Sequence, residues 1–186
     1  MERLNEKEKQ ELLIIARETL KRYYEKGEIP KFEIKNERLK ELKLGCFVTL
    51  KKHGHLRGCL GNFSSREPLY VNVQKMAIAS SKEDPRFEPV KKKELNEIEI
   101  EISVLYPLIE VNNFDEIKVG RDGLYIEYGF FRGVLLPQVA TEYGWDRDEF
   151  LSHTCLKAGL PQDAWKRLNL KVYRFEADVF SEKDLK

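Results

Sequence analysis

The sequence predicts an α+β protein with a mainly antiparallel sheet and flanking helices. Two observations support this fold class: β-prone runs come in pairs joined by short turns, at His53-Gly54 and at Gly129, and apolar residues recur at helical spacing between those pairs. Strands joined by tight turns pair antiparallel, which separates this pattern from a parallel α/β fold. The 186 residues are predicted to form one domain, 1–186, with room for two subdomains.

The composition narrows the classes of function. Lys and Arg number 33 and Asp and Glu 32, and a net charge of +1 creates no field that attracts nucleic acid or anionic membranes. Lys and Glu dominate the charged 35% of the chain, a balance typical of thermophile proteins. The longest apolar run, Leu12–Ala16, is too short to cross a bilayer, the first residues carry no secretory pattern, and the three cysteines form no CxxC pair. We therefore expect a cytoplasmic protein of a thermophile, without a disulfide framework.

Capping signals and periodicity predict four helices. Each follows a residue that favours a helix N-terminus, such as Asn5 with Glu8 or Asp146 with Glu149. The predicted helices cover residues 6–25, the segment after Ser64 or Ser65 with Pro68 in its first turn, the short stretch from Pro137, and the segment from Asp146 to Lys157 or Ala158.

Residues 45–63 are predicted to form a hairpin with His53-Gly54 as its central turn. In that register Val48 faces Cys59 and Leu50 faces Arg57. Because side chains alternate along a strand, one face would then carry Cys46, Val48, Leu50, Arg57 and Cys59.

Further strands are predicted at 97–105, around the turn at Gly129, and at 170–180, and residues 84–89 form a rigid loop between two prolines. Glu97, Glu99 and Glu101 alternate along the first of these strands. Carboxylates spaced about 7 Å apart do not share one ion, so we expect no metal site.

Cys59 is the first candidate for chemistry. Arg57 would lower the pKa of its thiol, and the flanking glycines would let a ligand approach the backbone. His55 is about 13 Å away along the strand, too far to serve as the base, which leaves His153 as the other histidine outside the hairpin. The alternative is that Cys59 is a packing residue.

A second candidate is an anion site where the strand that carries Arg57, Gly58 and Gly61 leads into a helix that begins near Ser65. Free N–H groups and the positive end of the helix dipole favour phosphate or carboxylate there, and Arg86 would join from the loop. The alternative, of equal weight, is that both arginines are structural and pair with buried carboxylates or carbonyls.

A third candidate is a pocket lined by Gln138, Thr141, His153 and Lys157 near Trp145 and Trp165. The alternative is that the histidine and the tryptophans belong to the core.

Seven motifs occur in an order that resembles the AMMECR family, named after a human chromosomal region linked to Alport syndrome, midface hypoplasia and elliptocytosis. They are GCFVTL, LRGCLG, DPRFEPV, IEISVL, VGRDGLYI, LLPQVATEYGW and CLKAGLPQDAW, and together they span nearly the whole chain. Asn62, where the family has threonine, and Asp122, where histidine is frequent, depart from the pattern.

The resemblance implies an α+β protein with a larger and a smaller lobe and a cleft lined by LRGCLG, but no established reaction or cofactor. It also implies a shared pathway with Memo-type and radical-SAM proteins. The motif positions that match the family include Asp84, Arg86, Gln138 and Lys157, which we count among the ligand-binding candidates. We expect a protein that binds a small anionic or nucleotide-like ligand at LRGCLG and that could be an enzyme. The alternatives are a non-catalytic partner of a Memo-type or radical-SAM protein, and RNA binding, which the charge disfavours.

Overall fold

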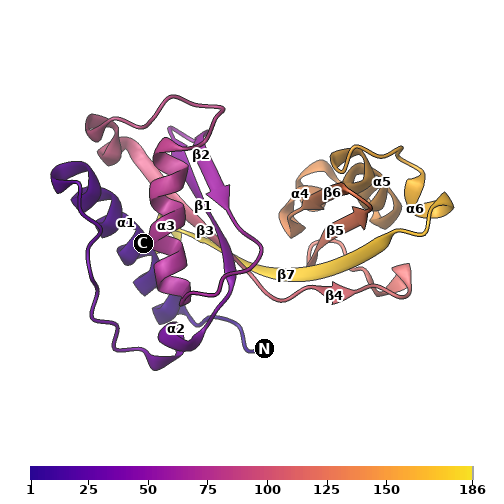
Figure 1. The fold of residues 1–186 in the computed structure, drawn as a ribbon, viewed down its shortest axis with the longest axis horizontal. Coiled ribbons are helices and arrows are strands. Elements are labelled where there is room, and N and C mark those ends of the chain that lie inside the picture. The colour runs from indigo at the N-terminus through magenta and orange to yellow at the C-terminus, as the bar shows by residue number, and fades with distance from the viewer. Residues whose placement is uncertain (186) are drawn as a thin grey trace. The chain divides into compact units, whose positions relative to one another are not determined.

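The computed structural model describes residues 1–185, and the chain divides into two compact units (Figure 1). Unit 1 comprises Met1–Leu105 and the C-terminal segment from Asp178, and unit 2 comprises Tyr106–Ala177. Strand β7 (Lys171–Ser181) begins in unit 2 and ends in unit 1. All strand pairs described below are antiparallel, which confirms the α+β prediction.

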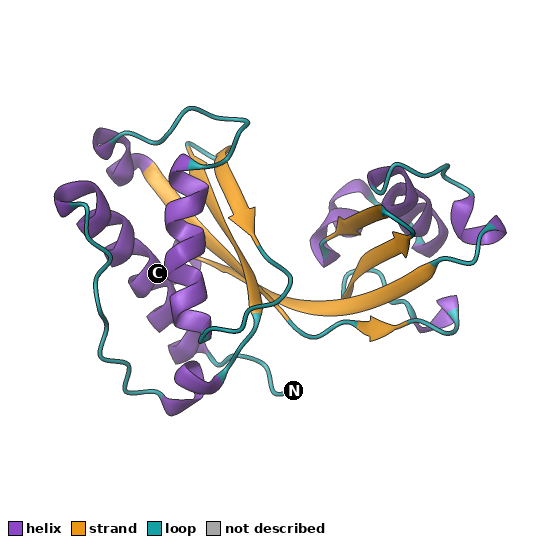
Figure 2. Cartoon of the chain, viewed as in Figure 1, coloured by secondary structure: helices purple, strands orange, loops and turns teal. Residues whose placement is uncertain are grey.

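Unit 1 packs helices against one face of a sheet (Figure 2). The strands follow the order β2 (His55–Gly61), β1 (Gly45–Lys52) and β3 (Ile98–Leu105). The covering helices are α1 (Glu6–Lys26) and α3 (Leu69–Lys82), with the short α2 (Glu37–Glu41) and the 3₁₀ turns η1 (Lys92–Glu97) and η3 (Glu182–Leu185) beside them. The core is formed by alternate strand residues and the helix stripes, including Val48, Leu50, Ile100, Ile102, Leu12, Ala16, Val73 and Ala77.

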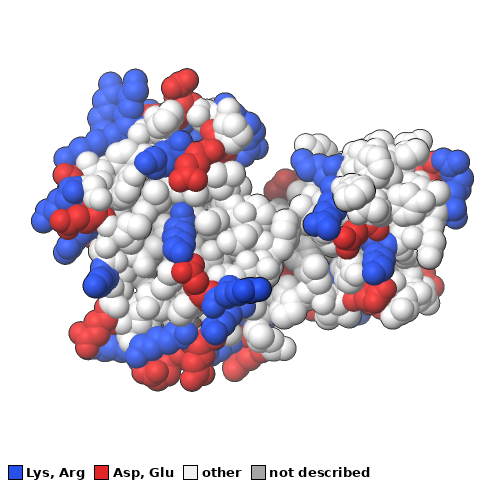
Figure 3. Space-filling view, viewed as in Figure 1, with Lys and Arg blue, Asp and Glu red and all other residues white. Residues whose placement is uncertain are grey.

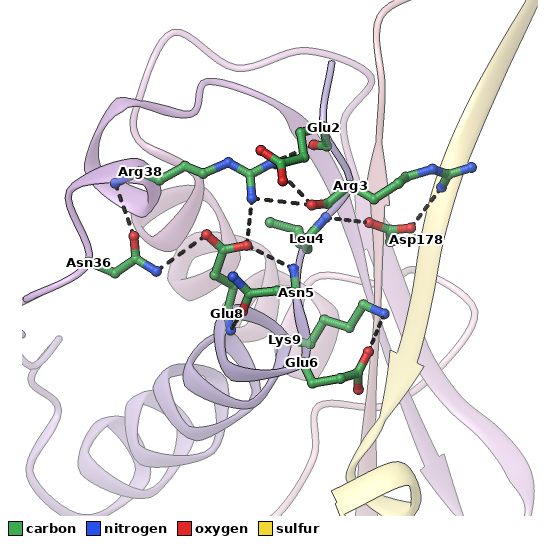
Figure 4. A network of polar contacts seen from close by, with 10 residues as sticks. All are labelled: Glu2, Arg3, Leu4, Asn5, Glu6, Glu8, Lys9, Asn36, Arg38 and Asp178. Carbon is green, nitrogen blue, oxygen red and sulfur yellow. Dashed lines mark hydrogen bonds and ion pairs between the residues drawn. The ribbon is translucent and has the colours of Figure 1, made fainter.

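A polar network fixes the start of α1 (Figure 4). Asn5 and Glu8 form the predicted capping box, and the carboxylate of buried Glu8 also accepts a hydrogen bond from Arg38 at 2.7 Å. Asp178 of β7 accepts hydrogen bonds from Arg3 and from the backbone N–H of Leu4, at 2.7 and 3.1 Å. The N-terminal segment is thereby attached to the last strand of unit 1.

Unit 2 has its own sheet, helices and core. Strand β5 (Asp122–Tyr128) pairs with β6 (Phe131–Leu135) on one side and β7 on the other, and β7 also pairs with β4 (Ile109–Glu110). Helices α4 (Pro137–Tyr143), α5 (Arg147–Lys157) and α6 (Ala164–Arg167) and the 3₁₀ turn η2 (Phe114–Glu116) complete the unit. Its core includes Leu124, Ile126, Phe150, Leu151 and Cys155.

The surface is rich in charges of both signs. On the face in Figure 3, Lys and Arg side chains are interspersed with Asp and Glu side chains over both units. Many of these side chains form ion pairs, such as Lys51–Glu101 and Lys183–Glu99, at 2.7 and 2.6 Å. None of the helices within residues 1–185 is long and apolar enough to span a membrane.

Candidate functional site

The β1–β2 hairpin departs from its predicted register. His53 and Gly54 form the predicted turn, both at positive φ. The pairing then shifts, because Arg57 is an extra residue that forms a β-bulge. Thr49 consequently pairs with Cys59, and Val48 pairs with Leu60.

The predicted pairs Val48–Cys59 and Leu50–Arg57 are therefore wrong. Since one inserted residue exchanges the two faces of a strand, Cys59 does not share a face with Cys46, Val48 and Leu50. Those three side chains are buried in the core, whereas Cys59 lies with Thr49 on the opposite face of the sheet.

Arg57 clamps the loop before η1 onto the edge of the sheet. Its Nε and Nη2 donate to the two carboxylate oxygens of Glu94, at 3.2 and 3.1 Å, and Nη1 and Nη2 donate to the carbonyls of Glu88 and Pro89, at 2.9 and 3.4 Å. The side chains of Arg57 and Glu94 are only 17% and 13% exposed. Hydrogen bonds from Arg57 and from the Lys91 backbone, with Lys52 nearby, lower the pKa of Glu94 from 4.5 to about 2. Arg57 thus pairs with a carboxylate and with backbone carbonyls, as expected for an arginine with a structural role.

Gly58 and Gly61 allow close packing on either face of β2. A Cβ atom at Gly58 would lie 2.1 Å from the carbonyl oxygen of Ser80 in α3, and one at Gly61 would lie 2.4 Å from both the Phe47 ring and the Cys46 carbonyl. The absence of a side chain therefore lets the helix approach one face and lets the Phe47 ring lie over the other.

Cys59 is a half-buried, uncharged thiol. Its Sγ lies 3.2 Å from the hydroxyl of Thr49, and burial raises its pKa above the ordinary value of 9.0. Thr49 was not among the predicted site residues, because its pairing with Cys59 depends on the bulge. His153 belongs to α5 in unit 2, where its ring stacks on Trp145 with 3.8 Å between centroids.

Asp84 and Arg86 cover the outer edge of β2 next to Cys59. The buried carboxylate of Asp84 accepts hydrogen bonds from the Cys59 backbone N–H at 2.9 Å and from Nε and Nη2 of Arg86 at 2.9 and 2.7 Å. Arg86 Nη2 also donates to the Cys59 carbonyl at 3.3 Å. Arg86, the Cys59 N–H and the Arg86 N–H hold the pKa of Asp84 well below its usual range. The structure thus brings together three of the predicted site residues, from the LRGCLG and DPRF motifs.

An aromatic pair lies farther along the same strands. Phe47 pairs in register with Gly61, two residues from the Thr49–Cys59 pair and on the same face of the sheet. The Phe47 ring contacts Phe63 edge to face, with 5.4 Å between centroids. The face of β1–β2 opposite the helices therefore presents a thiol, a hydroxyl and two aromatic rings, beside the Lys51–Glu101 ion pair.

The predicted helix start at Ser65 is wrong. Helix α3 begins at Leu69 with Pro68 as its N-cap and without a side-chain cap, and the Ser65 hydroxyl instead accepts a hydrogen bond from the Glu67 N–H at 3.0 Å. Arg57 also lies far from this end of α3, because the residue after it, Gly58, contacts Ser80 in the last turn. The structure therefore does not place Arg57 beside the amides of a helix N-terminus.

The third predicted group lies in unit 2. Gln138 belongs to α4, and its Oε1 is buried with no hydrogen-bond partner among the described residues. Lys157 is an exposed residue at the end of α5. Trp165 is buried in the core, and its Nε1 donates to Ser152 at 3.0 Å, while Tyr143, Trp145 and His153 form a stack of rings.

Residues 1–185 contain no group of three His, Cys, Asp or Glu side chains arranged to hold a metal ion. The most important site residue that the sequence did not reveal is Glu94. It lies 37 positions from Arg57, and no periodicity or motif links the two.

Comparison with known proteins places this chain among archaeal relatives. A protein of Methanocaldococcus jannaschii is 51% identical over 148 residues, which cover 75% of this chain and 74% of that protein. A protein of Pyrococcus abyssi is 46% identical over 183 residues, which cover 92% of this chain and 88% of that protein.

The fold also matches a solved structure. The crystal structure of an uncharacterized protein from Pyrococcus horikoshii has a TM-score of 0.83 and 42% identity, and the match covers 92% of this chain and 90% of that one. The AMMECR1 family model matches residues 13–180. The chain therefore belongs to the AMMECR1 family, as its motifs predicted.

Proposed function

We propose that the protein binds a small anionic, nucleotide-like ligand on the face of β1–β2 that carries Cys59, with Arg86 as the charged contact. The observation that carries the proposal is the geometry of Arg86. Its guanidinium is 56% exposed and is oriented by Asp84 through two hydrogen bonds, while Nη1 has no partner among residues 1–185. A preorientated guanidinium with free donors favours phosphate and carboxylate groups.

The other predicted ligand contacts take different roles in this proposal. Arg57 already uses its donors on Glu94 and two carbonyls, so we assign it to the support of the loop that carries Arg86. Gly58 and Gly61 provide the close packing beneath the site. Phe47 and Phe63 offer the apolar surface on which the ring of a nucleotide-like ligand would rest.

We assign Cys59 to binding and not to nucleophilic attack. Burial, with the nearby carboxylates of Asp84 and Glu101, raises the pKa of the Cys59 thiol, which is therefore protonated at neutral pH. The side chain that its Sγ contacts is the Thr49 hydroxyl, which is not a base. We place the protein in the cytoplasm, where its three free thiols would stay reduced.

Calorimetric titration with AMP, adenosine and inorganic phosphate tests the proposal. AMP should bind the wild type, and Arg86→Ala should weaken AMP binding about tenfold, the effect of one charge-assisted contact, with little change for adenosine. Arg167→Ala is the matched control, because Arg167 is 62% exposed and, like Arg86, paired with an aspartate. Equal AMP affinity in the wild type and in Arg86→Ala would refute the proposal.

A second candidate function is a non-catalytic role as the partner of a Memo-type or radical-SAM protein. The exposed aromatic side chains of unit 2, Phe130 and Phe131, favour it. Size-exclusion chromatography of the purified proteins, alone and mixed, would test this role. The interspersed charges of Figure 3 give less support to RNA binding.

A further inference from the structure

We propose that the tip of the β5–β6 hairpin is a docking surface for an extended segment of another protein in which apolar and acidic side chains alternate. The proposal is independent of the ligand site on unit 1. It rests on an exposed aromatic cluster, on the charges around it, and on the unpaired edge of β6.

The apolar part of this surface is the hairpin-tip cluster, formed by Tyr128, Phe130, Phe131 and Leu156. Phe130 is fully exposed at the turn, and Phe131 and Leu156 are half exposed. Large apolar side chains that gather on a surface mark interaction sites far more often than single ones do. Aromatic residues in particular are enriched at the centres of protein interfaces.

Helix α5 gives the cluster a rigid support. A Cβ atom at Gly133 of β6 would lie 2.4 Å from the backbone of Ala158, and one at Gly159 would lie 3.6 Å from the Phe131 ring. The last turn of α5, which carries Leu156, therefore packs directly against the start of β6. Phe131 and Leu156 thus lie on two elements that pack against each other, and Phe130 lies in the tight turn between β5 and β6.

Positive charges lie beside the cluster and on the opposite face of the hairpin. Lys157 follows Leu156 directly, and Arg132 and Lys171 both pair in register with Glu127 on the face of the sheet opposite Phe131. Neither lysine has an ion-pair partner within residues 1–185, and Arg132 pairs only with Glu127, at 3.1 Å. Three cations against one carboxylate favour a partner that brings acidic side chains.

The edge of β6 offers backbone hydrogen bonds to an added strand. Within the described residues β6 pairs only with β5, so it ends the sheet of unit 2. In a hairpin with a two-residue turn, the residues that flank the turn, Tyr128 and Phe131, exchange backbone hydrogen bonds. Because hydrogen-bonded and non-hydrogen-bonded pairs alternate, the N–H and C=O groups of Arg132 and Val134 point away from β5. An extended segment could pair with those groups, as in β-strand addition.

These features define the chemistry of the partner segment. A partner residue that lies beside Phe131 would point to the face of the sheet that carries Leu156, so it should be apolar. The next residue would lie beside Arg132 on the opposite face and should be acidic. The partner is thus a strand with period-two alternation of apolar and acidic side chains.

Fluorescence anisotropy with the full-length chain tests the proposal. The probe is a labelled, end-capped peptide of alternating valine and glutamate, and the reference is the same peptide with lysine for glutamate. The glutamate peptide should bind more tightly, Phe130→Ser should weaken it about tenfold, and Arg132→Glu should reverse the preference. Ile14→Ser, which removes an exposed isoleucine from α1, is the control and should leave the affinity unchanged.

Several results would overturn the proposal. Equal affinity of the wild type for both peptides would overturn it. Unchanged affinity of Phe130→Ser for the glutamate peptide would also overturn it, provided that a native circular-dichroism spectrum shows the variant to be folded. Binding to phosphatidylserine vesicles that requires Phe130, without peptide binding, would assign the surface to a membrane. Concentration-dependent dimerisation that Phe130→Ser abolishes would assign it to a second copy of the chain.

Discussion

At the scale of single residues, Arg57 and Glu94 form a clamp whose strength depends on pH. The folded state holds the pKa of Glu94 at about 2, below its ordinary value of 4.5, so the unfolded state binds the proton more tightly. The stabilisation is therefore fully present above about pH 5 and is lost as the pH falls toward 2.

We predict that Glu94→Gln lowers the free energy of unfolding by about 2 kcal/mol at neutral pH, because it removes the charge that Arg57 needs. The difference from wild type should shrink as the pH approaches about 2, where wild-type Glu94 is itself becoming protonated. Urea denaturation across this pH range measures both effects. Glu6→Gln, which breaks an exposed pair with Lys9, should cost less than about 0.5 kcal/mol at any pH, and a deficit in Glu94→Gln that stays constant with pH would contradict the account.

Gly58→Ala should destabilise the protein by about 3 kcal/mol, because its Cβ would overlap the Ser80 carbonyl and force α3 away from β2. Gly144→Ala is the control. That position also disfavours a side chain, through its φ of 67°, but nothing lies within 4 Å, so its cost should be about 1 kcal/mol. Equal losses in the two variants, measured by thermal unfolding, would show that packing at Gly58 is not the determinant.

At the scale of elements, the two long helices of unit 1 begin in different ways. Helix α1 has a capping box at Asn5, as α5 has at Asp146. Helix α3 begins without a side-chain cap, although serines precede it. Ser64 and Ser65, which precede α3, therefore do not cap it.

We therefore predict that Asp146→Ala lowers the free energy of unfolding by about 1 kcal/mol, the value of an N-cap, whereas Ser65→Ala lowers it by less than about 0.5 kcal/mol. Chemical denaturation of both variants measures the difference. A larger loss for Ser65→Ala than for Asp146→Ala would mean that the hydroxyl supports α3 after all.

The elements themselves could be predicted because their signals are local. The capping box at Asn5, the turn at His53 and the alternation along β3 each lie within a few residues, and the structure confirms them. The bulge at Arg57 could not be predicted, because no local signal marks it and the residues that contact Arg57 and Gly58, Glu94 and Ser80, are distant in the sequence. That one inserted residue moved Cys59 to the opposite face and gave it Thr49 as a partner.

At the scale of the whole molecule, membership of the AMMECR1 family covers residues 13–180 and therefore reaches both units. Strand β7 contributes to each unit, and the N-terminal segment is bonded to its Asp178. The proposed ligand contacts come from β1, β2, the segment after β2 that carries Phe63, and the loop after α3, all in unit 1, whereas the proposed docking surface lies entirely in unit 2. The two proposals can accordingly be tested separately.

We propose that Arg86, Cys59 and the Phe47–Phe63 pair line one ligand site. Amide chemical shifts of the isotope-labelled protein during titration with AMP test it most directly, because they report position as well as binding. Saturable shifts should be concentrated at Thr49, Cys59, Phe63 and Arg86, and they should weaken in Arg86→Ala. Saturable shifts that leave these four amides unchanged, or no shifts at all, would contradict it.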